Sequence, residues 1–264
     1  MARQFTFNGQ TSAENGIIIT RIQRPILPTL IKRKLTIAGQ DGAWDFGNNT
    51  YEESQILIEC TLIQPLSKRA LIRILALWLS DKSNISFSDE YDKYYYGRLY
   101  DTFTEEIDGL VGTFALTFEV DPFAYNLSKT TDEILLGADI PLGSDISLGN
   151  ADNYEITLTG PDSMSIDNFG TRSLRPTIII NGSFDDITIS FNGKSLAYGG
   201  PSASQELIID GLNYTAELDG VNKLDLITGD INTFLTLTPG ANEVTLTGTN
   251  LDCVIQFEFR PRYF

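Results

Sequence analysis

The chain has 264 residues with 35 acidic and 19 basic side chains, so its formal net charge is −16. Such an acidic surface repels phosphate backbones, which excludes sequence-specific nucleic-acid binding. Histidine is absent, which removes the Ser-His-Asp and Cys-His forms of catalysis and histidine-liganded zinc. The apolar fraction of 42% is typical of a globular protein and too high for a disordered chain.

The first ten residues contain no apolar run of the kind found in signal peptides. The longest apolar stretch, around residues 70–79, is interrupted by Arg73 and is too short to cross a bilayer. We therefore expect synthesis in a cytoplasm and no membrane insertion. The two cysteines, Cys60 and Cys253, lie 193 residues apart, and we favour two buried free thiols over one long-range disulfide.

Charge divides the chain into two halves. Residues 1–130 carry 13 basic and 16 acidic side chains, a net of −3, whereas residues 131–264 carry 6 and 19, a net of −13. The change coincides with a Gly-rich repeat in residues 131–150, where glycine and proline favour a linker or an extended arm. We predict an N-terminal domain over 1–130, a linker over 131–150 and a C-terminal domain over 151–264.

The N-terminal half combines strand and helix patterns. Residues 55–63 and 113–120 alternate apolar and polar side chains, which predicts two strands that each bury one face. Between them we predict a helix with Ser67 as its N-cap. Its apolar residues fall at i, i+3, i+4, i+7 and i+8 and form a single stripe, namely Leu71, Ile74, Leu75, Trp78 and Leu79. We predict that this stripe covers the sheet as core, and does not bind a cofactor or a partner.

The C-terminal half is predicted to be all β. Eight short runs rich in Ile, Leu and Thr recur about every ten residues, at 154–159, 177–180, 187–191, 206–209, 214–218, 234–237, 244–246 and 253–259. Four dipeptides that favour the positive φ angles of tight turns lie among them, namely Asn181-Gly182, Asn192-Gly193, Asp210-Gly211 and Asp219-Gly220. This spacing predicts a β-sandwich of the jelly-roll type.

Acidic residues are numerous, so we considered carboxylate catalysis and calcium binding. Adjacent pairs occur at Asp89-Glu90, Glu105-Glu106 and Asp185-Asp186. Neighbouring side chains of a strand point to opposite faces, so such pairs do not converge on one glycosidic bond. The sets Asp219, Asn222, Asp225 and Asp162, Asp167 lack the regular ligand spacing of a calcium loop. We expect no catalytic, cofactor-binding or metal-ligating residues, no cofactor, and a protein that is not an enzyme.

Residues 89–101 contain five tyrosines among acidic and basic side chains. Tyrosine presents an apolar ring with a polar tip and is enriched at protein interfaces. We interpret the segment as a strand and turn at such an interface. The alternative is a platform on which a sugar ring stacks.

Several short motifs follow one another in a fixed order. They are Phe5-x-Phe7-Asn8-Gly9 with Gly16-Ile17-x-Ile19; Ile37-Ala38-Gly39-Gln40-Asp41-Gly42; Trp78-Leu79 followed by Ile85-Ser86-Phe87-Ser88-Asp89-Glu90; Phe114-x-Leu116-x-Phe118 with Asp121-Pro122-Phe123-Ala124-Tyr125; and Leu237-x-Pro239-Gly240-x-Asn242 ahead of Arg262-Tyr263. Over nearly the whole chain they resemble the distal tail protein (Dit) family of long-tailed (siphovirus) bacteriophages, including prophage-encoded tail proteins. Ala38 stands where the turn of that family usually has proline.

The resemblance implies a mainly β fold. An N-terminal α+β ring-forming domain, with a sheet and one main helix, precedes a C-terminal galectin-like, jelly-roll β-sandwich. It implies a homohexameric ring in the tail tip or baseplate that joins the tail tube to the host-adhesion device. The expected partners are further copies of the chain, the tail tube protein, and tail-associated or receptor-binding baseplate proteins. The expected location is the virion, after assembly in the bacterial host cytoplasm.

The alternative function is a carbohydrate-binding adhesion module that recognises host cell-wall glycan, because galectin-like sandwiches often bind sugars. The C-terminal half contains neither tryptophan nor histidine, which galectin-like sites typically use. Tyr154, Tyr198 and Tyr214 remain as candidates for stacking on a sugar ring.

Overall fold

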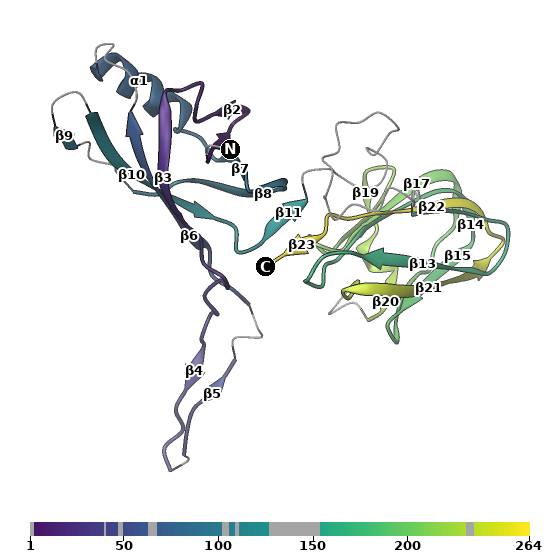
Figure 1. The fold of residues 1–264 in the computed structure, drawn as a ribbon. Helices are drawn as coiled ribbons and strands as arrows, with labels where there is room; N and C mark the ends of the chain where they lie inside the picture. Colours follow the sequence, from purple (N-terminus) through teal and green to yellow (C-terminus); the bar gives the residue numbers. More distant parts are fainter. Residues whose placement is uncertain are drawn as a thin grey trace. The chain divides into compact units, whose positions relative to one another are not determined.

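The computed structural model describes residues 3–39, 41–46, 50–62, 68–101, 106–108, 111–126, 154–230 and 235–264. The chain divides into two compact units, Met1–Leu127 with Phe264, and Ser128–Tyr263, and each is described by itself (Figure 1). Strands dominate both units, which confirms the predicted mainly β fold. Helix α1 (Lys68–Trp78) is the one α-helix among the described residues. The predicted linker over 131–150 lies outside them.

One antiparallel sheet forms the first unit, in the order β2-β1-β7-β8-β10-β6-β3. In chain order these strands are β1 (Phe5–Phe7), β2 (Gln10–Thr11), β3 (Ile17–Gln23), β6 (Ser54–Leu62), β7 (Ser83–Phe87), β8 (Glu90–Leu99) and β10 (Val111–Val120). Two short strands extend the sheet: β9 (Glu106–Asp108) pairs with β10, and β11 (Ala124–Asn126) pairs with β8. The two strands predicted from alternation are β6 and β10, which pair with each other and bury Ile58 and Leu116 completely.

Helix α1 packs on this core, but the predicted stripe is only partly buried. Leu75, Trp78 and Leu79 are buried, and the Trp78 indole stacks on Phe5 with 5.5 Å between ring centroids. Its Nε1 also donates a hydrogen bond to the carbonyl oxygen of Phe7, at 2.7 Å.

Ile74, which was predicted to share the buried stripe, is 55% exposed. Each helical residue is rotated by about 100° from the one before. The buried face is centred on Leu75, and Ile74, about 100° away around the helix, lies at the edge of that face and is largely exposed. The predicted N-cap, Ser67, lies outside the described residues.

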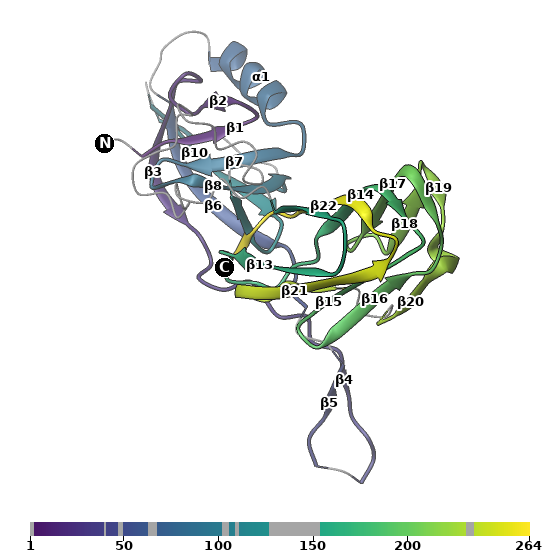
Figure 2. The ribbon, with the colours of Figure 1, turned by 90° about the vertical axis from the view of Figure 1, so that its right-hand side faces the viewer.

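A long excursion separates β3 from β6. We call residues 24–53 the hairpin arm. It contains β4 (Lys34–Leu35) and β5 (Trp44–Asp45), which pair as Lys34↔Asp45 and Leu35↔Trp44. Gly39 and Gly42 have φ values of 82° and 85°, which glycine adopts without steric cost. In Figures 1 and 2 the hairpin extends from one end of the first unit, while α1 lies at the other end.

Two antiparallel sheets form the second unit, in the orders β12-β22-β14-β17-β18-β19 and β13-β21-β15-β16-β20. The strands are β12 (Glu155–Leu158), β13 (Asp162–Asn168), β14 (Thr177–Phe184), β15 (Asp186–Phe191), β16 (Lys194–Tyr198), β17 (Ser202–Asp210), β18 (Thr215–Leu218), β19 (Val221–Asn222), β20 (Ile227–Gly229), β21 (Gly240–Thr249) and β22 (Asp252–Glu258), with a terminal β23 (Arg262–Tyr263). Alternate residues of both sheets, such as Ile180 and Leu246, meet in one core. This is the predicted sandwich.

Four strands of the two sheets were not predicted from the sequence, namely β13, β16, β19 and β20, and one predicted strand is wrong. The run at 234–237 is not a strand: Phe234 lies outside the described residues, and Leu237 forms only an isolated bridge with Leu174. The next residues turn instead of continuing the ladder, because Pro239 has no N–H to donate and Thr238 bonds to the side chain of Asn242.

Two of the four predicted turns are tight hairpins. Asn192-Gly193 has φ values of 54° and 73° and joins β15 to β16, and Asp219-Gly220 has φ values of 47° and 75° and joins β18 to β19. Asp210-Gly211 opens a longer turn, in which Asp210 Oδ1 accepts hydrogen bonds from the backbone of the residues that follow.

The fourth predicted turn, Asn181-Gly182, is wrong, because both residues lie inside β14. Gly182 sits at an irregularity in the pairing of β14 with β17, with a φ of 140°. A Cβ at this position would lie 2.4 Å from the carbonyl oxygen of Asp252. The glycine therefore permits the close approach of β22, and makes no hairpin.

Asn242, the last residue of the Leu237-x-Pro239-Gly240-x-Asn242 motif, has a structural role. Its side chain is fully buried, and its Oδ1 accepts hydrogen bonds from the backbone N–H of Thr238 and from Asn192 Nδ2 at 2.9 and 2.7 Å. Its Nδ2 donates to the carbonyl oxygens of Ile166, Thr238 and Gly240. This asparagine satisfies the buried backbone of the turn that precedes β21.

Candidate assembly surfaces

Among the described residues, no group of three His, Cys, Asp or Glu side chains is arranged to hold a metal ion. Asp219, a calcium candidate from the sequence, instead accepts hydrogen bonds from the Glu206 backbone N–H and from Gln205 Nε2, at 3.0 and 2.8 Å. Asn222 Oδ1 accepts from the backbone N–H of Leu224. These oxygens serve turns and strand edges, and do not converge on one point.

The two thiols are free and buried, as predicted. Burial raises the pKa of the Cys60 thiol to about 12 and also raises that of Cys253. The nucleophilic form of cysteine is the thiolate. Both cysteines therefore keep the protonated thiol at neutral pH and pack as core side chains.

One acidic pair behaves differently from the prediction. Asp89 and Glu90 were expected to point apart, but both form ion pairs with Arg24, which lies 3.2 Å from Glu90 through Nη1. The reason is that Asp89 belongs to the turn before β8, so strand alternation does not separate the two side chains. Burial raises the pKa of Glu90 despite the opposing effect of the Arg24 guanidinium. The pair anchors the start of the hairpin arm to the β7–β8 turn.

The tyrosine-rich segment is strand β8, and its rings are used mainly inside the first unit. Tyr94 is buried and stacks on Tyr125 at 5.6 Å, and Tyr95 packs edge-on against Phe87. Tyr96 is partly exposed, with Lys82 Nζ 4.7 Å from its ring centroid. These contacts leave no row of free tyrosine faces among Tyr94, Tyr95 and Tyr96.

The tyrosines considered for sugar stacking are also engaged. Tyr154 and Tyr198 are buried in the core of the sandwich, where Tyr198 packs against Phe184. Tyr214 is 36% exposed, with the Arg175 guanidinium 4.8 Å from its ring centroid. Two of the three candidates therefore cannot reach a sugar without unfolding of the core.

The hairpin arm, in contrast, exposes large apolar side chains. The register pairs Leu35 with Trp44, and the backbone N–H of Phe46 bonds to the carbonyl of Arg33. Alternation puts Leu35, Ile37, Trp44 and Phe46 on one face of the hairpin, and Lys34 and Asp45 on the other. All four apolar side chains are about half exposed. We call Leu35, Ile37, Trp44 and Phe46 the apolar arm face.

This surface was not predicted from the sequence, although the pattern that indicates it is present. Leu35-x-Ile37 and Trp44-x-Phe46 alternate on either side of a glycine-containing turn, Gly39 to Gly42. This is the pattern of a hairpin with one apolar face. The short length of each run hides it when the chain is searched for longer strands.

A second apolar surface lies on α1. Ala70, Ile74 and Leu77 fall at i, i+4 and i+7, and all three are exposed, Leu77 by 79%. Residues at this spacing share one side of a helix. We call these three residues the outer helix stripe. Arg73, also exposed, lies beside it.

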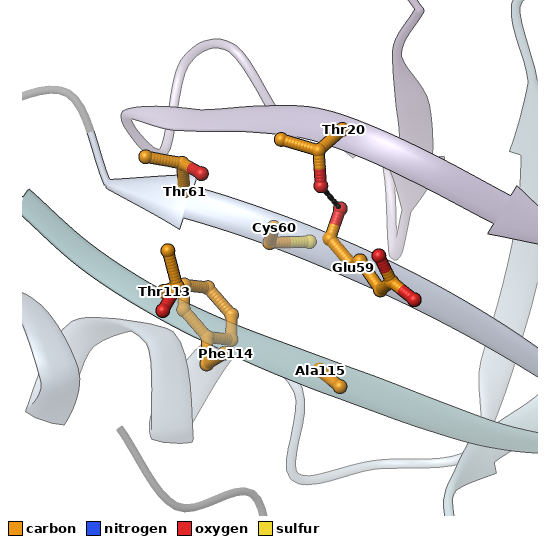
Figure 3. A pocket seen from close by; sticks show the side chains of 7 residues that line it. All are labelled: Thr20, Glu59, Cys60, Thr61, Thr113, Phe114 and Ala115. Atoms are coloured by element: carbon orange, nitrogen blue, oxygen red, sulfur yellow. Dashed lines mark hydrogen bonds between the residues drawn. The ribbon is translucent and has the colours of Figure 1, made fainter. Parts of the chain in front are cut away.

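A third surface is an open depression beside β3, β6 and β10, with a volume of about 440 Å³ (Figure 3). Its lining is Thr20, Glu59, Cys60, Thr61, Thr113, Phe114 and Ala115. Thr20 Oγ1 donates a 2.9 Å hydrogen bond to the backbone carbonyl of Glu59, drawn in Figure 3. The exposed side chains are short and mostly carry hydroxyls, and the depression therefore offers little apolar area.

Two comparisons with known proteins find similarities. Residues 16–120 match the family model of the phage tail protein RIFT-related domain. The crystal structure of the Dit (gp 19.1) protein of phage SPP1, described as a hub of the adsorption apparatus in phages that infect Gram-positive hosts, matches with a TM-score of 0.65. It is 18% identical, and the match covers 100% of both chains.

A structure of the phage p2 baseplate in its activated conformation with strontium covers 98% of both chains, at 13% identity and a TM-score of 0.42. No curated protein sequence matches the chain. Within the described residues, no helix is long and apolar enough to cross a membrane.

Proposed function

We propose that this chain, which carries a phage tail domain within the fold of a distal tail protein, is a structural component of a phage tail tip or baseplate. In this role it forms a homohexameric ring that joins the tail tube to the host-adhesion device. Its partners are other copies of the chain, the tail tube protein, and tail-associated or receptor-binding baseplate proteins. It acts in the virion by binding and positioning them, and not by catalysis.

The apolar arm face is the observation that carries the ring proposal. Leu35, Trp44 and Phe46 stand on a thin hairpin that has no core of its own, yet each is about half exposed. Contiguous exposed apolar area of this kind marks an interaction surface. A single hairpin is at best marginally stable in water, so the arm gains stability when a neighbouring surface covers it.

The different compositions of the two halves suggest different roles for the two domains. We propose that domain 1–130 makes the ring, that residues 131–150 connect the two domains, and that domain 151–264 is a docking or spacing sandwich. The glycan-binding alternative is not proposed, since Tyr154 and Tyr198 serve the core of the sandwich.

The test is the mass of the full chain by light scattering over a range of concentrations, with ring symmetry read from negative-stain images. A hexamer has a mass of about 176 kDa, six times 29.3 kDa. We expect Trp44→Ser combined with Phe46→Ser to abolish the hexamer and leave the melting temperature of the monomer unchanged.

The matched control is Ile18→Ser, which removes an exposed apolar side chain of the same unit outside the arm. This variant should assemble like the unmodified chain. Only monomer at every concentration and salt tested would contradict the ring proposal.

A further inference from the structure

The outer helix stripe is not explained by the fold of the first unit. Helix α1 already buries Leu75, Trp78 and Leu79, yet it also carries Ile74 and Leu77 on an exposed side, 55% and 79% exposed. A helix that needs only one apolar face in its domain usually carries polar residues on the other. The second apolar side therefore indicates a surface that is covered in the assembled state.

The charges of the helix and the arm tip are opposite. Helix residues 68–78 contain three basic residues, Lys68, Arg69 and Arg73, and no acidic one. In the β4–β5 ladder Asp45 lies opposite Lys34, so Asp41 supplies the negative charge at the arm tip, where residues 37–46 contain no basic side chain. Both surfaces thus combine exposed apolar side chains with charge, and the signs are complementary. Such complementarity selects partners and orients their approach.

The positions of the two surfaces fit a head-to-tail contact. In both views the β4–β5 hairpin and α1 lie at opposite ends of the first unit (Figures 1 and 2). A contact between two different surfaces of identical chains repeats from copy to copy, and it closes into a ring when the rotation between copies allows.

The depression beside β6 and β10 is a weaker candidate for receiving the arm. Its exposed lining, Thr20, Thr113 and Ala115, is small and largely polar. The charged residue in it, Glu59, is already paired with Arg21 at 3.6 Å. An apolar hairpin face gains little free energy there compared with burial against isoleucine and leucine.

We infer that the hairpin arm of one copy docks its apolar face on the outer helix stripe of α1 in the next copy, with Asp41 of the arm facing Arg73 of the helix. This assignment rests on the proposed ring and names the surface that receives the arm. It makes Ile74 and Leu77 interface residues in the assembly.

A cysteine cross-link tests the contact directly. The full chain carrying Asp41→Cys and Arg73→Cys is oxidised at assembling concentration and run on a non-reducing gel. The native Cys60 and Cys253 are buried and do not interfere. We expect a ladder of covalent multimers up to six chains. The matched control, Asp41→Cys with Thr113→Cys, places the second thiol beside the depression and should stay monomeric on the gel.

A charge swap tests the same contact without cross-linking. Arg73→Glu should weaken association at least tenfold by light scattering, and adding Asp41→Arg should restore it. The docking would be overturned, with the ring intact, if the Arg73→Glu and Leu77→Ser variants both assembled like the unmodified chain. It would also be overturned if only the control cysteine pair gave a ladder. A chain that remains monomeric under all conditions would remove both the ring and the docking.

Discussion

The two units share antiparallel sheets and a dense apolar core, but they differ in what they leave exposed. In the described part of the second unit, the exposed large apolar residues are spread over turns and short edge elements, for example Leu212 and Val221. In the first unit most of them lie on the hairpin arm and on α1. Net charge differs in the opposite sense: residues 131–264 carry a net charge of −13, and residues 1–130 only −3.

This difference separates two physical tasks. A surface dominated by carboxylates stays solvated and soluble, whereas ordered apolar rows favour close contact with another protein surface. The first unit therefore has the properties of an assembly module, and the second those of a self-sufficient sandwich. Substitutions in each unit test this contrast, because their effects on stability should stay within the unit that carries them.

Trp78→Ala should have the largest effect. It removes a buried indole that stacks on Phe5 and bonds to Phe7, and such a loss costs roughly 3–5 kcal/mol. Calorimetry of the full chain should show a lower melting temperature for the first unit and an unchanged transition for the second. Equal shifts in both transitions would show that the units do not unfold independently.

Asn242→Ala is the counterpart in the second unit. The change leaves the buried backbone of the Thr238 turn without its side-chain partner, and unsatisfied buried groups cost about 1–3 kcal/mol each. We expect a loss of about 3 kcal/mol, confined to the transition of the sandwich, in denaturant titration. A control, Asn213→Ala, removes an exposed asparagine that bonds Asp210 and should be nearly neutral.

Gly182→Ala should cost about 1–3 kcal/mol, because the new Cβ meets the backbone of Asp252 and the residue keeps a positive φ. Gly193→Ala is the comparison, since nothing lies within 4 Å of its Cβ position although φ is 73°. A smaller loss for Gly193→Ala in thermal melts would assign the difference to the close approach of β22. Equal losses would assign both to the φ angle alone.

Ile74→Ser should have the smallest effect on the unfolding free energy, within about 0.5 kcal/mol, because the side chain is largely exposed. The measurement is the same denaturant titration, performed at a concentration where the chain is monomeric. A loss comparable to that of Trp78→Ala would restore the predicted stripe, with Ile74 as part of the core.

Local patterns in the sequence determined much of the secondary structure. Alternation predicted β6 and β10 because the side-chain period of a strand depends only on the strand itself. Asn192-Gly193 and Asp219-Gly220 were found because their positive φ angles are set by the two residues concerned. The mainly β class and the two free buried thiols also followed from composition and spacing.

Tertiary structure decided where each pattern is used. Asn181-Gly182 has the composition of a turn, but the approach of β22, some 70 residues further along the chain, makes Gly182 a strand residue. Ile74 and Leu75 are equally apolar, and only the orientation of α1 on Phe5 and Phe7 determines which of them is buried. Burial and close approach depend on partners remote in sequence, and no local period or dipeptide contains that information.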